Sequence, residues 1–124
     1  MAEQTSILNT IKAMLVGDES ADEFSPFDAE LVTHINGSLA VLWQLGIGGA
    51  TGFQISGSTE TWADLGIASD VRLNMVKNYI YLRVKMVFDP PGSSYALNAL
   101  KEEASMMEWR IVNLPDMSAI LPVN

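Results

Sequence analysis

Residues 70–88 carry a helical pattern that constrains the fold more than any other part of the chain. Its apolar residues fall on two roughly opposite stripes of a helical wheel: Leu73, Val76, Ile80, Val84 and Val87 on one, and Val71, Met75, Tyr79, Leu82 and Met86 on the other. A helix that is apolar on two faces is buried on two sides, so we expect the central helix of a bundle or a helix shared between core and subunit contact. Asp89-Pro90-Pro91-Gly92 ends it, because a proline nitrogen cannot donate the next helical hydrogen bond.

Two helices are predicted before this segment. The first covers about residues 5–16, with apolar residues at helical spacing, namely Ile7, Leu8, Ile11, Met14 and Leu15. The second begins with Ser25 as N-cap and Pro26 at the first helical position, and it extends to about Leu45. Its expected core residues are Leu31, Ile35, Leu39 and Leu42. Gly46 ends this helix, since glycine adopts a left-handed cap without steric cost.

The last helix is predicted from about Ser94 to Val112. Its core stripe consists of Ala96, Leu97, Leu100, Ala104, Met107 and Ile111. Tyr95, Met106 and Trp109 fall together on the far side of the same helix. Exposed aromatic residues on one face indicate a partner surface, and packing of the tail of the chain over them is an equal alternative.

Two shorter stretches lie between these helices and after them. Residues 46–58 are rich in glycine and alternate apolar and polar residues at Phe53-Gln54-Ile55-Ser56, which predicts a short hairpin or an ordered loop. Thr61-Trp62-Ala63-Asp64 predicts a capped single turn with Trp62 anchored in the core. Residues 113–124 are too short to fold alone and too apolar for a typical disordered tail, so we expect an arm that docks on another surface.

The predicted fold class is therefore all-α. Residues 1–112 form a small bundle of four main helices with a short Gly-rich extended insertion or hairpin, and residues 113–124 form an extended C-terminal docking arm.

The composition argues against several classes of function. The chain has 124 residues, no cysteine and a single histidine, His34, which excludes disulfides, thiolate metal sites and multi-histidine metal sites. His34 has no Ser or Cys partner in a nucleophile motif, and the glycines of residues 46–52 lack the Gly-Lys-Ser/Thr ending of a phosphate-binding loop. We expect no enzymatic activity, no cofactor and no metal. No apolar run approaches the roughly 20 residues that span a bilayer, so we expect no membrane partner.

Acidic residues dominate the surface charge. The chain has 15 acids against 7 Lys and Arg residues, a formal charge of −8. Six acids lie close together in the first third of the chain, namely Asp18, Glu19, Asp22, Glu23, Asp28 and Glu30. Such a surface repels phosphate, so we do not expect sequence-independent binding of nucleic acid. A solvated acidic loop that keeps the protein soluble is the simplest interpretation.

One stretch closely matches a known signature: Val76-Lys77-Asn78-Tyr79-Ile80-Tyr81-Leu82-Arg83-Val84-Lys85-Met86-Val87-Phe88-Asp89-Pro90-Pro91, followed by Ser93-Ser94. Four further segments agree in order: Ser6-Ile7-Leu8-Asn9-Thr10-Ile11-Lys12, Asp28-Ala29-Glu30-Leu31 with His34-Ile35-Asn36, Gln44-Leu45-Gly46-Ile47-Gly48, and Glu108-Trp109-Arg110. In these residues the chain resembles the head–tail connector proteins of tailed bacteriophages, also called adaptor or head-completion proteins. The resemblance covers roughly residues 6–110.

The resemblance implies a subunit of a homo-oligomeric ring, typically twelvefold. Such a ring docks under the portal protein of the filled capsid, extends the DNA channel, and presents a platform for a downstream neck or tail-completion protein. The implied location is the head–tail interface of the virion, with assembly in the host cytoplasm. A closed ring needs two different contact surfaces on each subunit.

The ring hypothesis assigns two sets of residues. Candidate subunit or portal contacts are Tyr95, Met106, Trp109, Leu114, Ile120 and Leu121. Candidate channel-facing residues are Asp18, Glu19, Asp22, Glu23 and Phe53, because an acidic wall lets DNA pass without specific binding. The alternative is a small acidic helical regulator or inhibitor that binds a basic protein partner, which a free monomer or dimer would favour.

Overall fold

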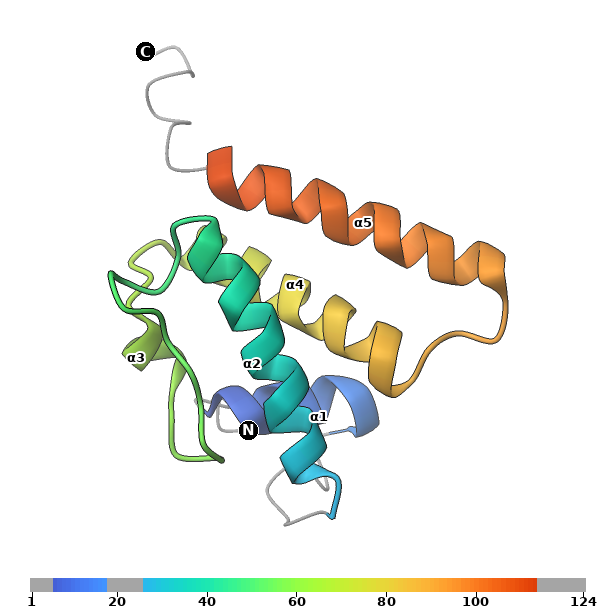
Figure 1. Cartoon of the computed structure of the whole chain (residues 1–124), viewed down its shortest axis with the longest axis horizontal. Coiled ribbons are helices and arrows are strands. Elements are labelled where there is room, and N and C mark those ends of the chain that lie inside the picture. Colours follow the sequence, from blue (N-terminus) through green and yellow to red (C-terminus); the bar gives the residue numbers. More distant parts are fainter. Residues whose placement is uncertain (1–5, 18–25, 114–124) are drawn as a thin grey trace.

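The computed structural model describes residues 6–17 and 26–113, and helices make up 70% of these residues. Five helices follow one another along the chain: α1 (Ile7–Val16), α2 (Asp28–Gln44), α3 (Trp62–Leu65), α4 (Asp70–Phe88) and α5 (Ser94–Asn113) (Figure 1). Within the described ranges there is no strand, only one antiparallel bridge between Ser6 and Thr61. The all-α class is therefore confirmed, with four longer helices and α3 as a single turn.

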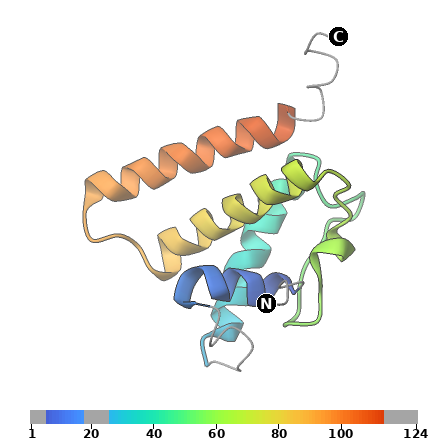
Figure 2. The same ribbon diagram turned by 180° about the vertical axis from the view of Figure 1, so that it is seen from behind.

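Helix α4 lies at the centre of the fold. Helix α5 packs along one side of it, and α1 and α2 cover the other side (Figures 1 and 2). The fully buried residues of α4 come from both apolar stripes: Val76, Tyr79, Ile80 and Val84. Burial on two sides is thus confirmed along the middle of the helix. The two ends differ, because within the described structure Val71 and Val87 are 63% and 59% exposed, and a subunit contact at these ends stays a prediction.

The core-facing residues of the first two helices agree with the sequence pattern. Four residues of α2 are buried as expected, namely Leu31, Ile35, Leu39 and Leu42. In α1, Ile7, Leu8 and Ile11 join the same core, whereas Met14 is 37% exposed because it lies at the edge of the stripe. The side chain of Ser6 caps α1 by accepting a hydrogen bond from the backbone N–H of Asn9.

The start of α2 differs from the prediction. The helix begins at Asp28, and Pro26 lies in the preceding turn rather than at the first helical position; Ser25 lies outside the described residues. Phe27 takes the N-cap position without a side-chain cap. Its ring packs edge-on against Phe88 at the end of α4, with centroids 5.8 Å apart. Phe27 and Phe88 are distant in the sequence. The local Ser-Pro pattern therefore does not predict this contact or the start of α2 beside it.

The end of α2 has the expected glycine cap. Gly46 has a φ of +97°, its N–H donates to the Trp43 carbonyl, and the Ile47 N–H donates to the Leu42 carbonyl at 2.9 Å. These two bonds form a Schellman motif, in which the residue after the glycine packs against the last turn of the helix. Ile47 and Leu42 are accordingly both buried.

The stretch between α2 and α3 is an ordered loop and not a hairpin. The Asn36 side chain donates to the Ile55 carbonyl at 2.9 Å and accepts from the Ile55 N–H at 2.8 Å. This pair of bonds fixes the loop to α2 and replaces the strand pairing that a hairpin would supply. The capped turn at α3 is confirmed: Thr61 and Asp64 form a capping box, and Trp62 is 4% exposed.

Candidate assembly surfaces

The outer face of α5 is the most exposed apolar surface among the predicted contact residues. The inner side of the helix is buried against α4 through Ala104, Met107 and Ile111. On the other side Tyr95 is 86% exposed, Trp109 68% and Met106 50%. Their expected position away from the core is confirmed, and their role in a contact stays a prediction. Tyr95 stands roughly 16 Å along the helix from Met106, at about 1.5 Å per residue, so the face is a long strip.

Helix α5 is joined to the rest of the fold by polar contacts as well as by its apolar stripe. The Tyr79 hydroxyl on α4 donates to Glu108 Oε2 on α5 at 2.6 Å. Arg83 lies over the Tyr79 ring at 5.8 Å, and its Nε donates to Ser38 Oγ on α2 at 3.2 Å. Burial raises the pKa of Tyr79, and its bond to Glu108 raises that pKa further. The outer face of α5 is therefore presented in one fixed orientation.

The basic residues of α4 are engaged within the chain. Lys77 lies 5.4 Å above the Trp62 ring, and Lys85 pairs with Asp89 at the end of its own helix at 3.4 Å. Within the described residues, neither lysine forms a salt bridge with an acid of another helix. The sequence analysis missed Lys12, which is 4% exposed and forms an ion pair with Asp28 at 3.0 Å, linking α1 to the start of α2.

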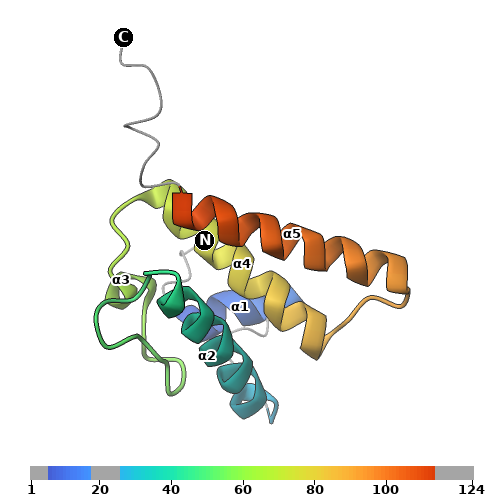
Figure 3. The ribbon, with the colours of Figure 1, turned by 45° about the horizontal axis from the view of Figure 1, so that its top comes forward.

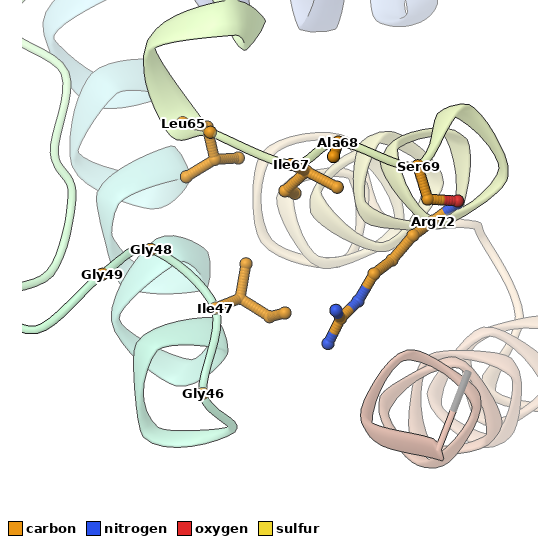
Figure 4. A pocket seen from close by; sticks show the side chains of 10 residues that line it. Gly46, Ile47, Gly48, Gly49, Leu65, Ile67, Ala68, Ser69 and Arg72 are labelled. Carbon is orange, nitrogen blue, oxygen red and sulfur yellow. The ribbon is translucent and has the colours of Figure 1, made fainter. Parts of the chain in front are cut away.

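A pocket of about 500 Å³ lies between the end of α2, the loop after α3 and the first turn of α4 (Figure 4). It is lined by Gly46, Ile47, Gly48, Gly49, Leu65, Gly66, Ile67, Ala68, Ser69 and Arg72. Apolar side chains form its walls, and Arg72 extends toward it from α4 (Figure 4). From the sequence, Gly46 is expected to cap the helix and the other glycines to belong to a hairpin or an ordered loop without a phosphate site; no pocket is predicted. The run of glycines is the one sequence feature that coincides with the pocket. The pocket itself could not be predicted from a local pattern, because it forms between segments about 20 residues apart.

Most of the other predicted site residues fall outside the described chain. These are Asp18, Glu19, Asp22 and Glu23 among the channel-facing candidates, and Leu114, Ile120 and Leu121 among the contact candidates. Phe53 is described; it is half-buried and packs against the core cluster. A Cβ at Gly48 would lie 3.6 Å from the Phe53 Cβ, so this side chain also supports the glycine loop.

The described residues contain no group of three or more His, Cys, Asp or Glu side chains that could hold a metal ion. In the same ranges no helix is long and apolar enough to cross a membrane. His34 is half-buried on α2, where its carbonyl accepts a hydrogen bond from Ser38 Oγ.

One family of known proteins matches the chain. The family described as phage connector protein matches residues 7–116. No curated protein and no solved structure matches the chain significantly.

Proposed function

The chain belongs to the family of phage connector proteins, which are structural components between phage head and tail, and we propose that it is the subunit of a closed adaptor ring. The ring docks under the capsid portal, extends the DNA channel and carries a neck or tail-completion protein. Twelve subunits are proposed, as in the rings that the sequence resembles. The subunit acts by binding and carries out no reaction.

The single observation that carries this proposal is the outer face of α5. Trp109 and Tyr95 are 68% and 86% exposed on a helix whose inner side buries Ala104, Met107 and Ile111 in the core. Large aromatic residues are enriched at protein interfaces, where burial of each ring removes a large apolar area from water. An exposed aromatic strip on a fixed helix is thus suited to bind another subunit or the portal.

A second apolar surface lies at another part of the molecule. The end of α1, the start of α2 and the end of α4 lie close together (Figures 1 and 2). Each contributes an exposed apolar side chain there: Val16, Phe27 and Val87 are 61%, 53% and 59% exposed. A ring needs a heterologous contact between two different surfaces of adjacent subunits. We propose that this end of one subunit contacts the α5 strip of the next.

The remaining assignments complete the proposed ring. Residues 113–124 act as an arm that reaches the portal or an adjacent subunit during assembly. The acidic residues between α1 and α2 face the channel, where like charge keeps DNA phosphate from binding to the wall. A basic lining of the assembled channel would contradict this last assignment.

Light scattering after size-exclusion chromatography tests the proposal, on the chain alone and after mixing with the portal protein of the same phage. We expect a discrete oligomer near twelve times the 13.5 kDa chain mass, or a monomer that joins the portal in a fixed ratio. Trp109→Ala is expected to weaken this assembly at unchanged helix content. Lys101→Ala, at an exposed α5 position about 80° or more around the helix from each residue of the aromatic strip, is the matched control. A monomer that ignores the portal and binds a basic protein instead would favour the acidic regulator.

A further inference from the structure

The pocket beside Arg72 combines apolar side chains with glycine backbone and one cationic side chain, so it suits a ligand with both apolar groups and a negative charge. Ile47 and Leu65 line it with side chains that are 5% and 6% exposed, and Ile67 lies between them (Figure 4). Glycines flank Ile47 on the same segment, so no side chains from these positions narrow the pocket (Figure 4). A volume of about 500 Å³ lies within the range of sites that hold small ligands or several side chains. Arg72 adds a guanidinium, which binds carboxylates through paired donors.

The C-terminal end of α5 lies next to this pocket. In Figures 1, 2 and 3 the last turn of α5 is beside the first turn of α4, which carries Arg72. Ile111, in that last turn, is fully buried. Asn113, which eleven further residues follow, therefore ends α5 close to the pocket. At about 3.3 Å per residue, even a few of them span its width.

The segment that follows matches the pocket in chemistry. Residues 114–124 read Leu-Pro-Asp-Met-Ser-Ala-Ile-Leu-Pro-Val-Asn, with five large apolar side chains, one acid and no base. The acid, Asp116, is three residues after Asn113. Its sign is complementary to that of Arg72, while Leu114 and Met117 are apolar like the pocket walls.

We propose that this pocket holds the chain's own segment 114–124, with Asp116 bound to Arg72 and with Leu114 and Met117 against Ile47 and Ile67. The segment belongs to the same chain because its start lies beside the pocket, so the local concentration of the tethered segment exceeds that of any second copy. The docked segment covers apolar surface in the free subunit. This docking does not depend on ring formation. It is tested on the isolated chain, so its failure would leave the result of the portal experiment unaffected.

Disulfide trapping tests the proposal in the full-length chain, which contains no cysteine of its own. One variant carries Ala68→Cys at the exposed rim of the pocket and Ser118→Cys in the segment. The matched control carries Ser105→Cys, an exposed site about two turns before the end of α5, with the same Ser118→Cys. Under mild oxidation we expect the pocket variant to form a reducible link within one chain at least ten times faster than the control.

The charge pair is tested by Asp116→Asn, which removes the negative charge and leaves Arg72 in place. We expect the rate advantage of the pocket variant to fall about two- to fivefold, the usual range for a partly exposed ion pair. Arg72→Lys is expected to keep part of the advantage, because the positive charge is retained. Asp116→Arg is expected to abolish it and to speed hydrogen exchange at residues 47–49 and 66–69.

Two results would overturn the proposal. Equal rates in the pocket variant and the control would mean that the segment moves freely around the end of α5. Covalent dimers and larger species in place of linked monomers would mean that the segment of a second copy occupies the pocket.

Discussion

Tyr79 on α4 and Glu108 on α5 are joined by a hydrogen bond of 2.6 Å between the phenol and the carboxylate. Tyr79 is fully buried, and Arg83, which lies over its ring, reaches on to Ser38 of α2. A continuous set of polar contacts therefore links three helices through the centre of the fold. Because Glu108 is adjacent to Trp109 in the sequence, this link also holds the turn of α5 that carries the exposed tryptophan against α4.

Tyr79→Phe removes the hydroxyl and leaves the half-buried Glu108 carboxylate without this donor. We expect the free energy of unfolding to fall by about 1–2 kcal/mol, in the range for a hydrogen bond to a charged group. Urea unfolding followed by circular dichroism measures the change. Tyr81→Phe is the matched control, because no hydrogen bond of the half-buried Tyr81 is seen in the described structure. Equal stability of Tyr79→Phe and the unmodified chain would contradict a role for this bond.

The raised pKa of Tyr79 predicts a loss of stability at alkaline pH. An unfolded tyrosine titrates near pH 10, whereas burial and the bond to Glu108 keep folded Tyr79 protonated above that pH. The contribution is fully present below about pH 10 and falls above it, because the unfolded chain then binds fewer protons than the folded chain. Unfolding free energies between about pH 9 and pH 11 should decline less steeply in Tyr79→Phe. Identical slopes would show that Tyr79 titrates normally.

Asn36 is predicted to hold the glycine-rich loop in place. Asn36→Ala removes both bonds to the buried Ile55 backbone and should lower the free energy of unfolding by about 1–3 kcal/mol. Asn36→Asp keeps the acceptor but loses the donor, so its effect should be intermediate at neutral pH. Hydrogen exchange at residues 52–56 should rise in the same order. Unchanged exchange in Asn36→Ala would mean that packing alone orders the loop.

The two sides of α5 should respond differently to truncation. Ile111→Ala removes a fully buried side chain and should cost about 2–5 kcal/mol through the cavity that it leaves. Trp109→Ala, at a 68% exposed position, should change the stability of the isolated subunit by no more than about 0.5 kcal/mol. Thermal or urea unfolding measures both. A large loss of stability in Trp109→Ala would show that its ring packs within the subunit. It would contradict the assignment of Trp109 to the contact strip.

Local signals in the sequence predicted the features that depend on neighbouring residues. Thr61 and Gly46 cap helices as their positions suggested, and Phe88 ends α4 before the two prolines. The helical pattern also placed Trp109 on the outside of α5.

Features that depend on contacts between distant segments were not predicted. The start of α2 accompanies the packing of Phe27 on Phe88, about 60 residues later in the chain. The exposure of Val71 and Val87 depends on where other helices cover α4, which periodicity does not encode. The two hydrogen bonds between Asn36 and the Ile55 backbone, and the pocket beside Arg72, arise only when the chain is folded.

Electron cryomicroscopy of the complex between the purified chain and its portal tests the central claim most directly. The account predicts a closed ring of this chain, coaxial with the portal, in which Trp109 of each subunit is buried at a contact with its neighbour or the portal. Portal particles without added density, or with the chain bound as scattered single copies and Trp109 exposed, would contradict the adaptor ring.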